Sequence, residues 1–247
     1  MTANNTKFRL IGIELMKTIG LIGGLSWESS IEYYRIINEM VRDRLGGLHS
    51  AECLMYSFDF AEIEALQASG DWETASYRMI AAARQVERGG ADCIVICSNT
   101  MHRMALDVQN AVDIELIHIA DATAKAIKAD GINKVGLLGT RFTMEQDFYK
   151  GRLVNEHGLD VIIPDDEGRT NVHNIIYNEL VIGEVKDSSR KIYQDVIAQL
   201  VQAGAQGVIL GCTEIELLIS DPKYSPVPVF PTTYLHAVAA VDWALDG

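Results

Sequence analysis

The chain has 247 residues, of which 48% are hydrophobic and 22% are charged, a balance typical of globular rather than disordered proteins. Its formal net charge of −13 argues against a nucleic-acid partner, because binding phosphates requires a basic surface. No apolar run approaches the roughly 20 residues that span a bilayer, so we expect no membrane association. Residues 1–15 lack a signal-peptide pattern and are interpreted as an N-terminal extension of a cytoplasmic protein.

The first half of the chain alternates apolar strands with amphipathic helices. Residues 17–24 form an apolar run that ends in two glycines, and residues 33–40 have the apolar spacing of a helix. A second helix is predicted over residues 73–88, and the pair of glycines that follows it is expected to end it. The segment 90–98 then contains a continuously apolar run, residues 93–97, with Ser98 at its carboxyl end.

The second half repeats this order. Residues 134–140 are again an apolar strand that is followed by a helical pattern, over residues 148–154. A helix over residues 188–203 ends at glycine, and the strand within residues 204–212 finishes at Cys212.

The two halves align as an internal duplication. Gly20 matches Gly136 at an offset of 116 residues, and the segment 90–98 matches its counterpart at an offset of 114. The second match places Ser98 on Cys212. Agreement of two separate blocks within two residues favours duplication over chance similarity.

Apolar strands alternating with helices are typical of parallel sheets covered on both faces. We therefore predict an α/β fold of two pseudo-symmetric, doubly wound domains, with a ligand cleft between the carboxyl ends of their strands. The strand at residues 115–119 is expected to open the second domain, and the strand at 227–230 to return to the first sheet. The first domain is then discontinuous, residues 16–114 plus 227–247, and the second covers residues 115–226.

Cys212 is the strongest catalytic candidate. It ends a strand and precedes a predicted helix, whose dipole and free amides would lower the thiol pKa from about 8.5 toward neutrality. The alternative is an inert, packed cysteine. Ser98 stands at the equivalent position, where it could also serve as a helix N-cap. Asn99, Thr100 and Thr213 offer donors suited to a carboxylate, or ordinary capping groups.

Two other site types are disfavoured by the sequence. The four cysteines (Cys53, Cys93, Cys97, Cys212) lack the spacing of a metal site. The glycines of residues 20–24 follow a Gly-x-x-Gly-Gly pattern rather than that of a dinucleotide-binding loop. We therefore expect neither a metal nor another cofactor.

Five segments together carry a resemblance to a known family. They are Gly-Gly-Leu-Ser-Trp-Glu-Ser at 23–29, Ser-Asn-Thr-Met-His at 98–102, His-Ile-Ala-Asp-Ala-Thr at 118–123, Gly-Thr-Arg-Phe-Thr-Met at 139–144 and Gly-Cys-Thr-Glu at 211–214. In these segments, and over residues 16–245 as a whole, the chain resembles the aspartate/glutamate racemases. The resemblance implies a homodimer that needs no pyridoxal phosphate, with one cysteine from each domain on either side of the substrate α-carbon.

Carried over residue by residue, the family's second cysteine is Cys212, whereas its first is replaced by Ser98. A cysteine stands one position earlier, at Cys97, and should point away from the cleft because successive strand residues face opposite sides. The resemblance therefore implies an atypical branch of the family that favours L-substrates. It assigns Thr140 and Thr143 to a substrate carboxylate.

The resemblance also concerns residues that would form the walls of the site. Ser26, in the loop after the first strand, is a plausible wall residue. The arginine and lysine that many aspartate racemases use are not evident in residues 59–62 and 179–183, which leaves Arg141 or Lys186 as substitutes. His102 and His118 are expected to act indirectly or to be structural.

The sequence thus predicts cofactor-independent racemisation of aspartate or glutamate, with Cys212 as base and Ser98, or a water that it holds, on the other face. Two alternatives remain: a single-thiol decarboxylase or dicarboxylate isomerase of the same superfamily, and a non-catalytic dicarboxylate sensor.

Overall fold

The computed structural model describes residues 16–219 and 221–246. The extension expected over residues 1–15 lies outside this part of the chain. None of the described helices is long and apolar enough to cross a membrane.

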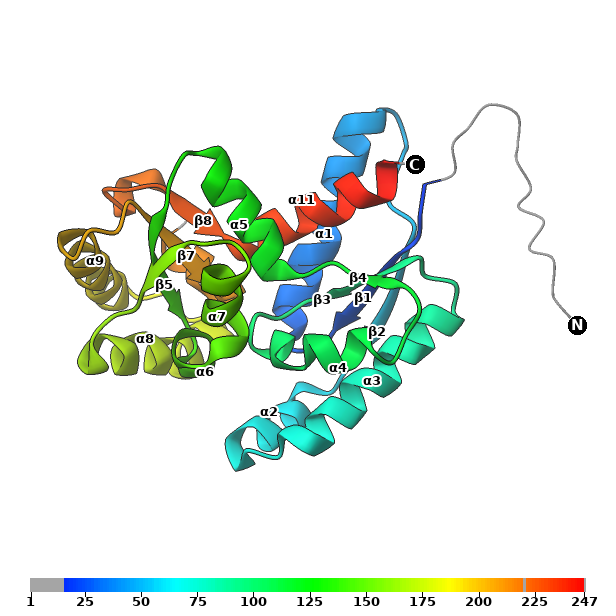
Figure 1. Cartoon of the computed structure of the whole chain (residues 1–247), viewed down its shortest axis with the longest axis horizontal. Coiled ribbons are helices and arrows are strands. Elements are labelled where there is room, and N and C mark those ends of the chain that lie inside the picture. The colour runs from blue at the N-terminus through cyan, green and yellow to red at the C-terminus, as the bar shows by residue number, and fades with distance from the viewer. Residues whose placement is uncertain (1–15, 220, 247) are drawn as a thin grey trace, which may run out of the picture.

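Two four-stranded parallel sheets form the framework (Figure 1). The first has the order β2-β1-β3-β4 and contains β1 (Ile19–Gly23), β2 (Cys53–Ser57), β3 (Cys93–Ile96) and β4 (Glu115–Leu116). The second has the order β6-β5-β7-β8 and contains β5 (Lys134–Gly139), β6 (Asp160–Ile162), β7 (Gly207–Gly211) and β8 (Val229–Pro231). Because the two orders are the same, the predicted pair of doubly wound halves is confirmed.

Helices cover both faces of each sheet. The first half contains α1 (Trp27–Leu45), α2 (Phe60–Ser69), α3 (Trp72–Arg88) and α4 (Ala105–Gln109). The second contains α6 (Arg141–Glu145), α7 (Asp147–Asn155), α8 (Asp166–Asn178), α9 (Asp187–Gln202) and α10 (Glu216–Ile219). Alternate strand residues enter different cores: Leu21 and Val95 pack toward α1, whereas Ile22 and Ile96 pack toward α2 and α3.

Two matched glycines support the duplication at atomic detail. A Cβ on Gly20 would lie 2.3 Å from Val86 Cγ1 of α3, and a Cβ on Gly136 would lie 2.8 Å from Leu200 Cδ1 of α9. Each glycine lets the equivalent helix approach its sheet closely. The repeated glycine therefore follows from repeated packing.

The strand assignment at the domain boundaries needs correction. Residues 115–119 were expected in the second sheet and residues 227–230 in the first, but β4 pairs with β3 and β8 pairs with β7. The link from α4 to β4 has only the five residues 110–114, which reach roughly 17 Å when fully extended, so β4 stays at the edge of its own sheet.

The helices after these strands do cross between the halves. Helix α5 (Ile119–Ala129) contributes Ile119, Ala124 and Ile127 to the core of the second half. Helix α11 (Thr232–Leu245) packs its alanines and Val241 into the core that α1 and β1 form. The two crossing helices also contact each other (Figure 1).

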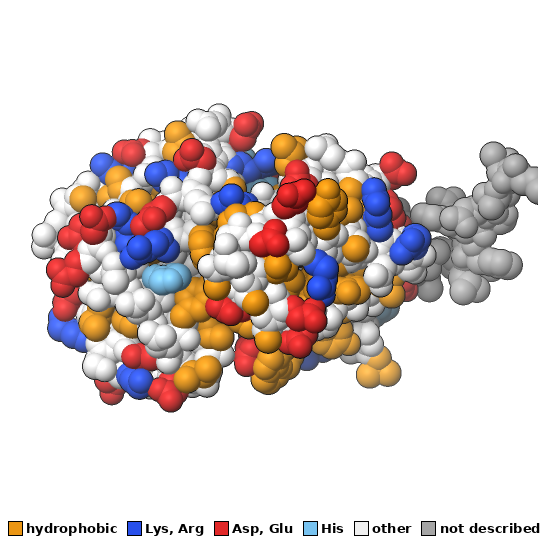
Figure 2. Space-filling view, turned by 90° about the horizontal axis from the view of Figure 1, so that it is seen from below, with side chains coloured by type: hydrophobic (Ala, Val, Ile, Leu, Met, Phe, Trp, Pro, Cys, Tyr) orange, Lys and Arg blue, Asp and Glu red, His pale blue; other side chains and the backbone are white. Residues whose placement is uncertain are grey.

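The face on which α2 and α8 lie is shown in Figure 2. Acidic and basic side chains are interspersed on this face, and hydrophobic side chains gather near the junction of the two halves.

Candidate active site

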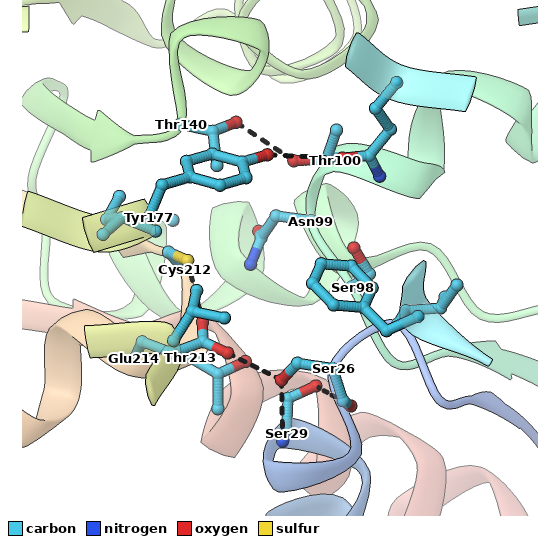
Figure 3. A pocket seen from close by; sticks show the side chains of 16 residues that line it. Ser26, Ser29, Ser98, Asn99, Thr100, Thr140, Tyr177, Cys212, Thr213 and Glu214 are labelled. Atoms are coloured by element: carbon cyan, nitrogen blue, oxygen red, sulfur yellow. Dashed lines mark hydrogen bonds between the residues drawn. The ribbon is translucent and has the colours of Figure 1, made fainter. Parts of the chain in front are cut away.

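One pocket lies between the halves at the carboxyl ends of β1, β3, β5 and β7, and it encloses about 470 Å³, including space open to solvent (Figure 3). Of the predicted site residues, seven line it: Ser26, Ser98, Asn99, Thr100, Thr140, Cys212 and Thr213. Only Thr143 does not. It is fully buried behind Thr140, whose side chain lies 3.2 Å away, Oγ1 to Oγ1. The sequence motifs therefore converge on a single site.

Cys212 follows β7 and is partly exposed to the pocket. Its thiol donates a hydrogen bond to Glu214, with Sγ 2.9 Å from Oε2. Burial, followed by the charge of Glu214, raises the pKa of the Cys212 thiol well above its usual value. The lowered pKa expected from the sequence is therefore wrong. The helix that was expected to lower it is a single 3-10 turn, Thr213–Ile215, followed by the four-residue α10, so little dipole faces the sulfur.

Glu214 is the main site residue that the sequence reasoning did not assign. The residue is 8% exposed, and Ser26 Oγ donates to its other oxygen, Oε1, at 2.8 Å. Glu214 is the only charged residue that lines the pocket within the described chain. The signal was present, because this glutamate ends the Gly-Cys-Thr-Glu segment, but no physical argument gave it a role.

Ser98 lies across the pocket from Cys212 (Figure 3). Its Oγ accepts a long hydrogen bond from Met101 N at 3.4 Å, whereas the N-cap of the following 3-10 turn, Thr100–Met104, is Asn99. His102 fixes the backbone of Ser98, because its Nδ1 donates to the Ser98 carbonyl at 2.7 Å while its Nε2 accepts from Ile119 N at 3.3 Å. Within the described residues, no carboxylate, imidazole or thiol is hydrogen-bonded to Ser98 Oγ, so no activating base is in contact.

Cys97 points away from the pocket, as the strand alternation predicted. It is fully buried in the core beneath α1 and α11, where burial raises the pKa of its thiol. It cannot act on a ligand in the pocket without a rearrangement of β3.

Two hydrogen-bonded pairs join the halves at opposite ends of the pocket (Figure 3). Ser26 and Thr140 are the N-caps of α1 and α6, so they occupy equivalent places after the first strand of each half. Ser26 bonds Glu214, and Thr140 Oγ1 lies 3.0 Å from Thr100 Oγ1. Glu214 stands two residues after Cys212, and Thr100 stands two residues after Ser98. The pairs are therefore equivalent, except that one end carries a carboxylate and the other is neutral.

Asn99 lines the pocket and carries an unpartnered acceptor. Its Nδ2 donates to Thr232 Oγ1 at 3.0 Å, whereas its buried Oδ1 has no hydrogen-bond partner among the described residues. A buried polar atom without a partner is costly. A ligand that donates a hydrogen bond, such as an ammonium group, would satisfy it.

The cations suggested from the sequence lie elsewhere. Arg141 donates a hydrogen bond to Thr170 and forms an ion pair with Glu145, and Lys186 pairs with Glu179 and Glu184. Neither lines the pocket. The described residues contain no group of three or more His, Cys, Asp or Glu side chains that could hold a metal ion.

Comparison with known proteins agrees with this architecture. Residues 22–240 match the family model described as Asp/Glu/Hydantoin racemase. A crystal structure of a putative Asp/Glu racemase from Yersinia pestis is 55% identical and has a TM-score of 0.88, covering 94% of this chain and 100% of that one.

Two further structures extend the comparison. An aspartate racemase homologue from Pyrococcus horikoshii OT3 is 37% identical, with a TM-score of 0.81 and coverage of 93% of this chain and 99% of that one. The aspartate racemase of Picrophilus torridus is 20% identical, with a TM-score of 0.73 and coverage of 92% and 94%, a likeness of fold alone.

Proposed function

The chain belongs to the Asp/Glu/hydantoin racemase family, and we propose that it interconverts the enantiomers of an acidic amino acid, aspartate or glutamate, without a cofactor. One observation carries this proposal. Ser98 and Cys212 stand at equivalent strand ends of the two halves and face one pocket from opposite sides. A substrate α-carbon held between them would present its two faces to the two side chains.

The polar residues around the space between Ser98 and Cys212 are suited to binding an amino acid. Glu214 and the unpartnered Asn99 Oδ1 supply acceptors for the α-ammonium group. The hydroxyls of Thr100 and Thr140 supply neutral donors for a carboxylate. Hydrogen bonds to the α-carboxylate would also stabilise the negative charge that develops when the α-proton leaves.

Proton transfer would begin at Cys212. Because its thiol already donates to Glu214, the carboxylate can accept that proton and leave a thiolate, which then removes the α-proton of the L-substrate. The carbanion takes a proton on its other face from the Ser98 hydroxyl or from a water that Ser98 holds. Solvent then returns a proton to Ser98. Cys212 keeps the proton that it removed, and Glu214 releases its own proton to solvent, which restores the starting thiol, carboxylate and hydroxyl.

Proton NMR in D₂O tests the proposal directly. Incubation of L-Asp, D-Asp, L-Glu and D-Glu with the enzyme should replace the α-proton by deuterium and produce the opposite enantiomer for at least one pair. Tight binding without any deuterium incorporation would identify a dicarboxylate sensor instead and overturn the proposal.

The single thiol of the pocket favours one second candidate. An enzyme that decarboxylates a small dicarboxylate needs only one proton donor for the resulting enolate, a role that Cys212 could fill. Release of carbon dioxide from substituted malonates, in the absence of α-proton exchange in amino acids, would support that reaction over racemisation.

We also propose a homodimer, which the family resemblance implies. Helix α1 supports it with an exposed apolar face, on which Trp27, Ile31 and Tyr34 are 62%, 50% and 52% exposed at helical spacing. Sedimentation velocity should show a dimer that Ile31→Glu dissociates. A dimer that persists in this variant would place the interface elsewhere.

A further inference from the structure

The pocket must select a substrate side chain without a cation. Among the described residues that line it, none is lysine or arginine, although an acidic substrate carries a second carboxylate. The protein's net charge of −13 gives no long-range attraction for an anion. Any selection of the side chain must therefore come from local, neutral hydrogen-bond donors.

Gln67 of α2 is such a donor. It lines the pocket although only 6% of its surface is exposed. Its carboxamide has two N–H groups, but the acceptor for Nε2 within the described chain is the thioether of Met101, at 3.1 Å from Sδ. A thioether is a weak acceptor. Gln67 Nε2 therefore keeps donor capacity that a ligand oxygen could use better than Met101 does.

Tyr177 of α8 holds this carboxamide in place from the other half of the molecule. Its hydroxyl donates to Gln67 Oε1 at 3.3 Å, which leaves Nε2 as the free end of the amide. Burial, with a smaller effect from Cys212, raises the pKa of the Tyr177 phenol, so the group stays neutral and keeps its proton. In Figure 3 Tyr177 extends toward Thr140 and Thr100, the end of the pocket without a carboxylate.

The wall beside this pair is apolar. Phe60 and Val181 line the pocket in the two segments, residues 59–62 and 179–183, that correspond by resemblance to the cation-bearing segments of many aspartate racemases. Leu25 and Ile176 add further apolar surface. A substrate side chain that enters here meets apolar contacts along its length and finds Gln67 as a polar contact at its end.

We infer that Gln67 is a specificity-determining residue, whose Nε2 binds the terminal oxygen of the substrate side chain while Tyr177 orients it. This inference rests on the proposed racemisation. It predicts a substrate class: amino acids whose side chain ends in an oxygen acceptor, whether carboxylate or carboxamide. Because a neutral amide provides the contact, the KM values for L-Glu and L-Gln should differ far less than they would in a site that binds the side chain through a cation.

The test compares α-proton exchange in D₂O for L-Glu, L-Gln and L-2-aminobutyrate, which has no terminal oxygen. Gln67→Leu should raise KM for L-Glu and L-Gln roughly 10- to 100-fold, the effect of one lost hydrogen bond to a charged or polar ligand group. It should leave L-2-aminobutyrate unchanged, which damage to folding would not do. Gln202→Leu, at an exposed position of α9, is the matched control and should alter nothing.

A gain-of-function variant provides an independent measurement. Val181→Lys places a cation in the pocket wall and should raise kcat/KM for L-Glu relative to L-Gln by about fivefold. Unchanged KM values for L-Glu and L-Gln in Gln67→Leu, or an equal loss on all three substrates, would refute the inference while racemisation stood. Failure of the wild-type enzyme to exchange any α-proton would instead refute the proposed function, and the inference with it.

Discussion

The Cys212 thiol donates to the Glu214 carboxylate at 2.9 Å, so the proposed base is protonated by default and lies next to a group that can take its proton. The carboxylate has two opposite effects. It raises the pKa of the Cys212 thiol by its charge, and it provides the site to which the proton can move. Binding of a substrate ammonium beside Glu214 would offset the first effect, which couples formation of the thiolate to the presence of substrate.

Glu214→Gln separates these two effects. Loss of the negative charge should lower the pKa of Cys212, measured as the pH dependence of its alkylation, with Cys212→Ala as the blank. At the same time kcat should fall by roughly 10²-fold, because the proton acceptor is gone. Cys53 and Cys93 should not interfere, since burial raises the pKa of their thiols to about 11 and about 12. A rise in kcat would show that Glu214 only suppresses the thiolate.

Cys212→Ala should abolish α-proton exchange, a loss of at least about 10³-fold, while calorimetry still detects substrate binding. Cys212→Ser should be nearly as inactive, because a hydroxyl is a much weaker base than a thiolate. Cys97→Ala is the matched control, since Cys97 lies in the core away from the pocket. Substantial exchange by Cys212→Ala would refute the assignment of the base.

Ser98 should make exchange asymmetric between the enantiomers. In the proposed mechanism L-substrate meets the thiol side, so it should take up deuterium faster than it inverts, because Cys212 can return a deuteron to the face it deprotonated. D-substrate meets the weaker base. Since the enantiomers have equal free energy, kcat/KM for net conversion must still be equal in both directions.

Ser98→Cys should therefore raise exchange of the D-substrate, measured by proton NMR in D₂O. Equal exchange of both enantiomers by the wild-type enzyme, unchanged by this substitution, would show that Ser98 does not serve the second face.

Stability should fall on mild acidification because buried histidines must stay neutral in the folded state. Burial, followed by the charge of Arg152, lowers the pKa of His118 to about 3, and burial lowers that of His236 to about 4. The unfolded chain therefore binds more protons below pH about 6.5, so the free energy of unfolding decreases as the pH falls from there toward these values.

His118→Asn isolates one of these contributions. His118 caps α5 by accepting from Ala120 N at 3.1 Å, a role that asparagine can also fill. The variant should show a shallower decrease of the melting temperature between pH 6.5 and 4.5. Comparison with the wild type is needed because Glu216 has the opposite effect. Its pKa is raised to about 7, so its protonation increases the free energy of unfolding as the pH falls. An identical slope in both proteins would contradict the prediction, and exposed His49→Asn serves as the control.

The fold could be predicted because its signals are local and repeated. The strands that end near Gly23 and Gly139, and the helix over residues 73–88, follow from apolar periodicity and glycine stops. Placement of the short strands β4 and β8 could not be predicted in this way. A strand of two or three residues carries little pattern of its own, and its sheet is decided by the reach of the neighbouring chain.

Most of the pocket was also predictable, because residues at the carboxyl ends of parallel strands meet. The electrostatics of the site were not. The pKa of Cys212 depends on how deeply the sulfur is buried and on the direction of one carboxylate, neither of which the sequence specifies. Gln67 and Tyr177 lie 110 residues apart on different helices, and only the closed arrangement of the two halves brings them together.

The reciprocal crossing of α5 and α11 has a consequence for the origin of the chain. Each half ends in a helix that completes the core of the other half, and the two helices contact each other at the junction. Two separate copies of a single half would show this same exchange as a domain-swapped dimer with twofold symmetry. The duplicated chain has the form of such a dimer joined end to end, an arrangement in which the two faces of the pocket need not be identical and can carry serine on one side and cysteine on the other.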